Sequence, residues 1–197
     1  MTNITINDIT GVILAGGQAR RMGGQDKGLI QLSNRPMIQH VIDRISPQVN
    51  SLIINANRNQ AEYESFGYPV ISDELNGFCG PLAGFSSALD NISTNYLVTT
   101  PCDSPFIPKD MVIRLYNAMD QNNADISVVQ TNNRLQPVFC LLKKSLLSSL
   151  NSFLELGERK IDKWFALHNM IAVDFSDESS AFNNINTQDD LSKAEQR

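Results

Sequence analysis

Short apolar runs alternate along the chain with segments whose apolar residues recur at helical spacing. The runs have the length and composition of buried strands and are expected at Ile9–Leu14, Val49–Ala56, Tyr68–Ser72, Asn95–Thr100, Ala124–Gln130, Pro137–Leu142 and Met170–Phe175. The helical segments are expected at Pro36–Ile45, Asn57–Phe66, from Gly84 to Leu89 or Ile92, Pro108–Met119, Lys144–Leu156, Arg159–His168 and from Gln188, where Thr187 is the N-cap. This alternation predicts an α/β fold with an open, mostly parallel sheet and helices on both faces.

The connection after the first expected strand is long, glycine-paired and basic. It opens with Gly16 and Gly17, carries Arg20 and Arg21, has a second glycine pair and ends at Lys27. Glycines at the carboxyl end of a strand let backbone N–H groups face an anion, and the cationic side chains suit a triphosphate. The spacing of the glycines and the lysine matches neither a Walker A loop nor the glycine fingerprint of dinucleotide-binding proteins. A flexible basic surface loop is the weaker alternative, because ordinary connections of this type are short.

Polar residues stand at the predicted carboxyl ends of several strands, where open α/β sheets bind their ligands. Asp103 follows one strand, and a carboxylate facing a triphosphate suits Mg²⁺; a turn-capping aspartate is the alternative. Lys27 would place a positive charge on the phosphates, unless it is a solvated surface lysine. Asn55 and Asp73 would read base or ribose edges, and a turn or cap role for them is nearly as well supported.

Composition narrows the class of protein. The 197 residues are 42% hydrophobic and 19% charged, which suits one globular domain, and the net charge of −5 argues against a general nucleic-acid or anionic-membrane binder. Cys79, Cys102 and Cys140 lie far apart without a C-x-x-C pair, which favours reduced thiols over disulfides. No signal sequence or membrane-length apolar run is present, so we expect a cytoplasmic protein.

Other candidate groups have plainer interpretations. His40 and His168 lie on or near expected helices and are interpreted as packing or capping residues. Trp164 and Phe165 belong to an amphipathic segment and are expected in the core. The charged residues around Gly157 are typical of a solvated helix junction. No Cys/His cluster predicts zinc, and no pattern of nucleophile and base predicts covalent catalysis.

The stretch LAGGQARRMGGQDK resembles the signature L-A-G-G-x-x-x-R-M-G-x-D-K of sugar-nucleotide and cofactor nucleotidyltransferases. Further segments extend the resemblance over nearly the whole chain, to the molybdenum cofactor guanylyltransferase (MobA) family: NANR from Asn55, Asp73, GPLAG from Gly80, PCD ending at Asp103, GER from Gly157 and FNNINT from Phe182. The resemblance implies a single three-layer αβα, Rossmann-like nucleotidyltransferase domain. It also implies Mg²⁺-dependent transfer of GMP from GTP to the terminal phosphate of Mo-molybdopterin, with release of pyrophosphate.

The resemblance also implies roles for individual residues. The nucleotide would be bound by about residues 1–105 and the acceptor by about 106–197. Molybdoenzymes or their chaperones would be protein partners, and neither nucleic acid nor a membrane would be. GTP would be bound by Leu14, Ala15, Gly16, Gly17, Lys27, Asn55, Asp73 and Asp103; catalysis would use Lys27, Asp103 and Arg21, with Asp103 also the Mg²⁺ ligand; and molybdopterin would be bound by Gly80, Gly84, Arg159, Asn184 and Asn186.

Two departures from the family pattern, Asn183 and Lys160, touch the acceptor side. The acceptor phosphate is already ionised near neutral pH, so the enzyme needs alignment and charge neutralisation rather than a general base. Rival readings are a cytidylyltransferase acting on the same pterin, another nucleotidyltransferase, and a nucleotide sensor or cofactor chaperone that binds without transfer.

Overall fold

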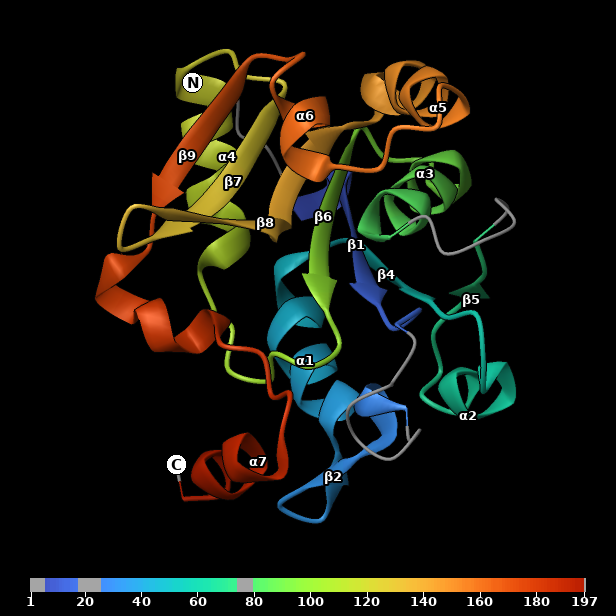
Figure 1. The fold of residues 1–197 in the computed structure, drawn as a ribbon, viewed down its shortest axis with the longest axis vertical. Coiled ribbons are helices and arrows are strands. Elements are labelled where there is room, and N and C mark those ends of the chain that lie inside the picture. Colours follow the sequence, from blue (N-terminus) through green and yellow to red (C-terminus); the bar gives the residue numbers. More distant parts are fainter. Residues whose placement is uncertain (1–5, 18–25, 74–79, 197) are drawn as a thin grey trace.

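The structure of the protein is a computed structural model that describes residues 6–17, 26–73 and 80–196. A seven-stranded sheet runs through the molecule in the order β5-β4-β1-β6-β8-β7-β9 (Figure 1). β5, β4, β1 and β6 are parallel to one another, and β9 is parallel to β7. β8 runs antiparallel to its two neighbours, β6 and β7. The strands are β1 Ile9–Leu14, β4 Ser51–Asn55, β5 Val70–Ile71, β6 Tyr96–Pro101, β7 Ile126–Thr131, β8 Arg134–Lys143 and β9 Met170–Asp174. The predicted mostly parallel α/β sheet is confirmed.

Helices cover both faces of this sheet and give it three layers (Figure 1). They are α1 Met37–Ile45, α2 Gln60–Glu64, α3 Pro81–Asn91, α4 Met111–Gln121, α5 Leu147–Glu155, α6 Ile161–Phe165 and α7 Gln188–Ala194. Alternate residues of β1 face opposite layers: Ile13 packs with α1 and α4, whereas Val12 packs with α3, α5 and α6. A smaller cluster ties α7 to α1 through Leu191 and Met37. No helix in the described part of the chain is long and apolar enough to cross a membrane.

A small hairpin before α1 was not predicted from the sequence. β2 (Gln31–Leu32) pairs antiparallel with β3 (Arg35–Pro36) across a turn in which Ser33 and Asn34 have positive φ. Two residues a strand are too few to produce a detectable alternation. Pro36 therefore belongs to the hairpin, and the helix begins one residue later than expected, at Met37.

The β7–β8 hairpin also begins earlier than expected. β8 starts at Arg134 rather than Pro137, because Asn132 and Asn133 both adopt positive φ and close a two-residue turn. Pro137 is tolerated within the strand since the pairing with β7 shifts there, from Cys140 opposite Val128 to Gln136 opposite Val129.

Several helices are shorter than expected, among them α2 and α6. α2 begins at Gln60 rather than Asn57, because Asn59 adopts a left-handed conformation with φ 50°. α6 begins at Ile161, and after Phe165 it continues as tight turns in which the N–H of His168 bonds to the carbonyl of Phe165.

Candidate functional site

The carboxyl ends of β4, β1 and β6 lie side by side. Leu14 pairs with Asn55 on one side and with Pro101 on the other. The register continues into the loops, since the N–H of Ala15 donates to the Asn55 carbonyl at 2.8 Å and the N–H of Cys102 donates to the Leu14 carbonyl at 3.1 Å. The expectation that the glycine turn after β1 and the aspartate after β6 meet at one sheet edge is confirmed.

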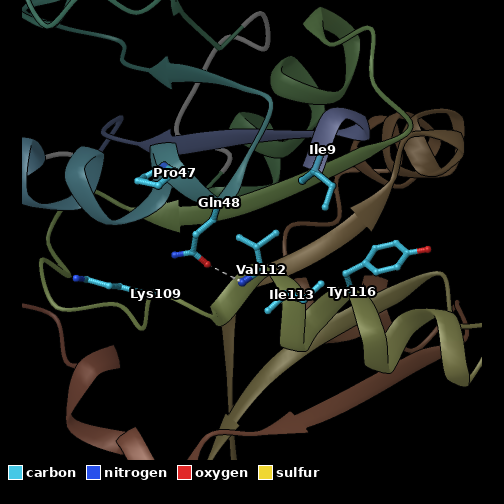
Figure 2. Close-up of a pocket in the computed structure, with 7 residues that line it drawn as sticks. All are labelled: Ile9, Pro47, Gln48, Lys109, Val112, Ile113 and Tyr116. Carbon is cyan, nitrogen blue, oxygen red and sulfur yellow. Dashed lines mark hydrogen bonds between the residues drawn. The ribbon is translucent and has the colours of Figure 1, made fainter. Parts of the chain in front are cut away.

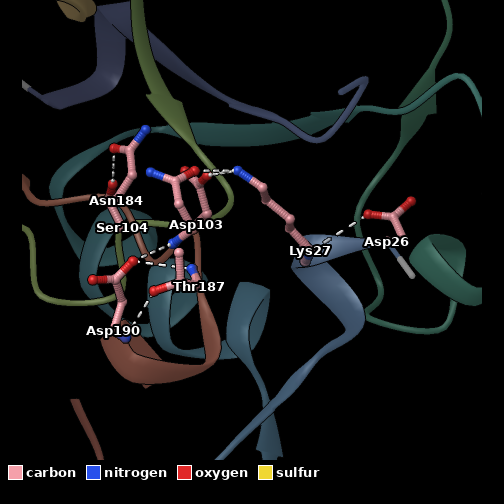
Figure 3. A network of polar contacts seen from close by, with 9 residues as sticks. Asp26, Lys27, Asp103, Ser104, Asn184, Thr187 and Asp190 are labelled. Atoms are coloured by element: carbon pink, nitrogen blue, oxygen red, sulfur yellow. Dashed lines mark hydrogen bonds and ion pairs between the residues drawn. The ribbon is translucent and has the colours of Figure 1, made fainter. Parts of the chain in front are cut away.

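Lys27 and Asp103 form an ion pair at this edge. Lys27 begins the short 3₁₀ helix η2 (Lys27–Leu29), and its Nζ lies 2.9 Å from Oδ2 of Asp103 (Figure 3). The Asp103 side chain is 8% exposed and that of Lys27 is 24% exposed. The second carboxylate oxygen of Asp103, Oδ1, is buried and has no hydrogen-bond partner. In this pair, Oδ2 of Asp103 is neutralised by Lys27, whereas Oδ1 remains an acceptor available to a cation.

The loop before α7 closes over the same pair. Asn186 accepts a hydrogen bond from Lys27 Nζ through Oδ1, and the N–H of Ile185 donates to the Asp103 carbonyl at 2.8 Å. Asn184 accepts from Ser104 Oγ at 2.9 Å (Figure 3). Asn184 and Asn186, predicted on the acceptor side, thus flank Asp103.

The start of α7 holds that loop in place. Thr187 and Asp190 form a capping box in which each side chain accepts from the backbone N–H of the other residue. Asp190 Oδ2 also accepts from the N–H of Asn186 at 3.1 Å, so the cap fixes the backbone of the residue that contacts Lys27.

At the opposite side of β1, Asp73 is held by two asparagines. Asn55 Nδ2 donates to Asp73 Oδ1 at 3.0 Å, and Asn57 Nδ2 donates to Oδ2 at 2.8 Å. Asn57 Oδ1 also accepts from the N–H of Asp73, and Arg58 donates to the Gly17 carbonyl at 3.1 Å. Both carboxylate oxygens of Asp73 therefore have fixed directions, with further lone pairs able to accept from a ligand.

The two glycines predicted to lie near the acceptor are at the start of α3. Gly80 is its N-cap with φ 69°, a conformation that favours glycine, and Pro81 follows. At Gly84 a Cβ would lie 2.7 Å from Asn55 Oδ1 and 2.8 Å from Leu14 Cδ2. Gly84 thus lets α3 approach the strand ends that carry the site.

Arg159 lies in the connection between α5 and α6. Its Nη1 donates to the carbonyls of Leu154 and Glu158, both at 2.7 Å, so in this structure it caps the helix. Its predicted contact with the acceptor stays a prediction. Arg20 and Arg21, with the second glycine pair and Cys79, lie outside the described residues.

Asp26, Asn57 and Ser104 were missed from the sequence as residues of the site. Each is adjacent or close to a residue that was predicted, and each is a short polar side chain beside a strand end or glycine turn. The signal was present in Asn57, which belongs to the NANR segment that starts at Asn55. Pairing with Asp73 needed the structure, because the two residues belong to different strand–loop connections.

The structure confirms the packing, capping and free-thiol roles that the sequence predicts for several side chains outside the site. A ring nitrogen of His40 pairs with the Leu32 carbonyl at 2.9 Å. His168 pairs with Ser149 Oγ at 2.9 Å, and burial lowers its pKa, opposed by the charge of Asp125. Trp164 and Phe165 are buried in the core. Cys102 and Cys140 are free and buried, and burial raises the pKa of both thiols, that of Cys140 to about 12.

The described residues contain no group of three or more His, Cys, Asp or Glu side chains that could hold a metal alone. One carboxylate with an unsatisfied oxygen instead suits an ion such as Mg²⁺, which takes one or two carboxylates and completes its shell with phosphate oxygens and waters.

A cavity of about 180 Å³ lies at the other end of β1 (Figure 2). Ile9 lines it with the start of α4, and Ile9 is the first residue of the strand whose last residue is Leu14. Gln48, Lys109 and Tyr116 are the polar residues of its lining, and the Gln48 amide is satisfied by the Arg44 and Pro108 carbonyls and by the N–H of Val112. The cavity is mostly apolar and is separate from the strand ends described above.

Comparison with known proteins matches residues 11–172 to the family model of the MobA-like NTP transferase domain. The chain is 54% identical over 179 residues to the molybdenum cofactor guanylyltransferase of Shewanella sediminis, covering 91% of each chain. The corresponding enzyme of Shewanella loihica is 52% identical with the same coverage.

Solved structures have the same fold. Molybdopterin-guanine dinucleotide biosynthesis protein A from Archaeoglobus fulgidus superposes with a TM-score of 0.79 at 26% identity, over 95% of this chain and 97% of that one. 4-Diphosphocytidyl-2C-methyl-D-erythritol synthase from Anaerococcus prevotii gives 0.74 at 13% identity, over 98% and 100% of the two chains. At that identity the second match shows the fold alone.

Proposed function

This chain belongs to the MobA-like NTP transferase family, and from that membership we propose that it transfers GMP from GTP to Mo-molybdopterin. The products would be the guanine dinucleotide form of the cofactor and pyrophosphate. The observation that carries the proposal is the Lys27–Asp103 pair beside the glycine turn of β1, in a chain 54% identical to a molybdenum cofactor guanylyltransferase. A cytoplasmic location is part of the same proposal.

In the proposal, GTP lies across the carboxyl ends of β1 and β4. The backbone from Leu14 to Gly17 faces the phosphates, where N–H groups and the Lys27 ammonium neutralise charge. The guanine edge lies toward Asn55 and Asp73. A carboxylate suits the guanine N–H groups, and the two asparagine amides hold the Asp73 carboxylate in a fixed orientation.

Asp103 would hold Mg²⁺ through its unsatisfied oxygen. When bound, the ion would neutralise charge on the triphosphate as pyrophosphate leaves. Lys27 lies within reach of the same phosphates and adds a second positive charge, and Arg21 is proposed as a third, outside the described residues. An ionised oxygen of the acceptor phosphate forms the bond to the α-phosphorus while the bond from that phosphorus to the pyrophosphate oxygen breaks. The enzyme therefore aligns the two phosphates, and no side chain has to remove a proton.

The acceptor would lie on the other side of Asp103, in the part of the chain from about residue 106 onward. Asn184, Asn186 and Arg159 of this part are proposed to bind it, together with Gly80 and Gly84 at the start of α3, which lie in the nucleotide part of the chain. The contact between Asn186 and Lys27 supports this arrangement, because it joins a residue from the proposed acceptor part to one from the nucleotide part. Molybdoenzymes or their chaperones are proposed to receive the product.

The test is the nucleotide dependence of the purified protein. We expect pyrophosphate release and formation of a guanine dinucleotide from Mo-molybdopterin, Mg²⁺ and GTP, with little reaction from CTP, ATP or UTP. Chelation with EDTA should stop the reaction and added Mg²⁺ should restore it. Preferential use of CTP would identify a cytidylyltransferase instead. Tight GTP binding without pyrophosphate release would identify a sensor or chaperone.

A further inference from the structure

Asp26 is a buried carboxylate next to Lys27 that the proposed chemistry does not use. It is 7% exposed, and its two oxygens have three partners. Oδ1 accepts from the Tyr63 hydroxyl at 2.5 Å and from the N–H of Gly28 at 3.4 Å, and Oδ2 accepts from Asn59 Nδ2 at 3.3 Å. A charged group is rarely buried without a specific reason for its position. These bonds tie the segment that carries Lys27 to α2.

Tyr63 is a rigid hydrogen-bond partner for Asp26. Its side chain is fully buried in the core layer shared by α1 and α4, so its ring is held by packing. A Cβ on residue 28 would lie 2.6 Å from the Tyr63 hydroxyl oxygen. Gly28 therefore allows the hydroxyl to reach Asp26, and the backbone on the carboxyl side of Lys27 lies directly against the tyrosine.

The backbone of Lys27 is held on both sides, by Asp26 before it and by Gly28 after it. Asp26 is the N-cap of η2, and its carbonyl also accepts from the N–H of Leu29 at 3.0 Å. The lysine side chain, which has many rotamers, extends from this fixed backbone to Asp103 (Figure 3).

We propose that Asp26 and Tyr63 are positioning residues that hold Lys27 where its ammonium meets both Asp103 and the triphosphate. The inference rests on the proposed function of Lys27 in binding GTP. Asn59 supports Asp26 from the same side, and Gly28 supplies the space that the contact needs. None of these residues has to touch the nucleotide.

The test removes one hydroxyl. Tyr63→Phe keeps the ring and its packing but takes away the 2.5 Å hydrogen bond to Asp26. We expect kcat/KM for GTP to fall about tenfold, as for loss of a strong hydrogen bond to a charged group, while KM for Mo-molybdopterin stays unchanged. Tyr116→Phe is the matched control, because it removes a tyrosine hydroxyl that bonds to Asp120 on α4, away from the strand ends.

A double-mutant cycle with Lys27→Met separates positioning from general destabilisation. GTP affinity is measured by calorimetry with Mg²⁺ for the native chain, Tyr63→Phe, Lys27→Met and the double variant. If Tyr63 acts through Lys27, Tyr63→Phe weakens GTP binding in the native background and has no effect once Lys27 is gone. An equal loss in both backgrounds, or no loss in the native background, overturns the proposal.

The cycle uses GTP alone and therefore also separates the two hypotheses. A native chain that binds GTP but releases no pyrophosphate with Mo-molybdopterin would refute the proposed function, and the cycle would still report on the anchoring of Lys27. A native chain with full transferase activity, in which Tyr63→Phe lowers the melting temperature but leaves kcat/KM for GTP unchanged, would refute the positioning role and leave the function standing.

Discussion

Replacing Asp103 with asparagine should abolish the activity without weakening the fold. An aspartate that served only to cap a turn would bond to nearby backbone N–H groups. Instead, the described partner of the Asp103 side chain is Lys27 at 2.9 Å, and Oδ1 has no partner. These surroundings are what we expect of a carboxylate retained for binding a charged ligand at a cost in stability, and that role is the hypothesis under test.

The expected changes in the free energy of unfolding and in kcat follow from the surroundings of the two carboxylate oxygens of Asp103. The ion pair with the partly exposed Lys27 contributes roughly 1 kcal/mol or less after screening by solvent. The unsatisfied buried oxygen costs about 1–3 kcal/mol. Asparagine keeps a buried polar atom at this position but carries no charge, so its desolvation costs less than that of the carboxylate, which offsets the lost ion pair. We therefore expect the free energy of unfolding to change by less than about 1 kcal/mol, or to increase. Loss of an electrostatic contact to the reacting phosphates should lower kcat by at least ~10²-fold.

Urea unfolding and pyrophosphate release, measured on the same preparation, test both halves of this prediction. Asp125→Asn is the matched control, because Asp125 forms an ion pair with Lys143 at 3.0 Å, away from the strand ends that carry the site. It should leave the activity unchanged. The reasoning is refuted if Asp103→Asn retains near-native turnover with Mg²⁺. It is also refuted if the variant loses several kcal/mol of stability, since Asp103 would then be structural.

Two further substitutions and one labelling experiment test other parts of the structure. Gly84→Ala places a Cβ 2.7 Å from Asn55 Oδ1, well inside ordinary contact, so unfolding should become easier by about 1–3 kcal/mol despite the better helix former, and KM for GTP should rise. The pKa of the His168 imidazole is lowered in the folded state. As the pH falls below about 6.5, the unfolded chain therefore binds a proton more readily than the folded chain, and the free energy of unfolding decreases. His168→Asn should show a smaller decrease than the native chain between about pH 8 and about pH 5.5, measured by urea unfolding. Cys102 and Cys140 should resist iodoacetamide at pH 8 until urea unfolds the chain, as peptide mass spectrometry would show; rapid native labelling would contradict their burial.

Much of the fold was predictable because its signals are local. Buried strands such as Ile9–Leu14 are continuous apolar runs, and helices such as Met37–Ile45 have apolar residues at helical spacing. The glycines after β1 and the aspartate after β6 follow such runs directly, so the sheet edge that carries them could be identified. The hairpin at Gln31–Pro36 could not, because two residues a strand leave no periodic signal.

The sequence by itself determined most of the elements, the mostly parallel sheet and the polar residues that end its strands, because hydrophobic periodicity and turn chemistry act over a few neighbouring residues. The tertiary structure decided which of those residues meet. Lys27 contacts Asn186 across 159 positions of the chain, and Asp26 contacts Tyr63 across 37. Such contacts depend on strand register and on the packing of helices over the sheet, which arise from the folded chain as a whole.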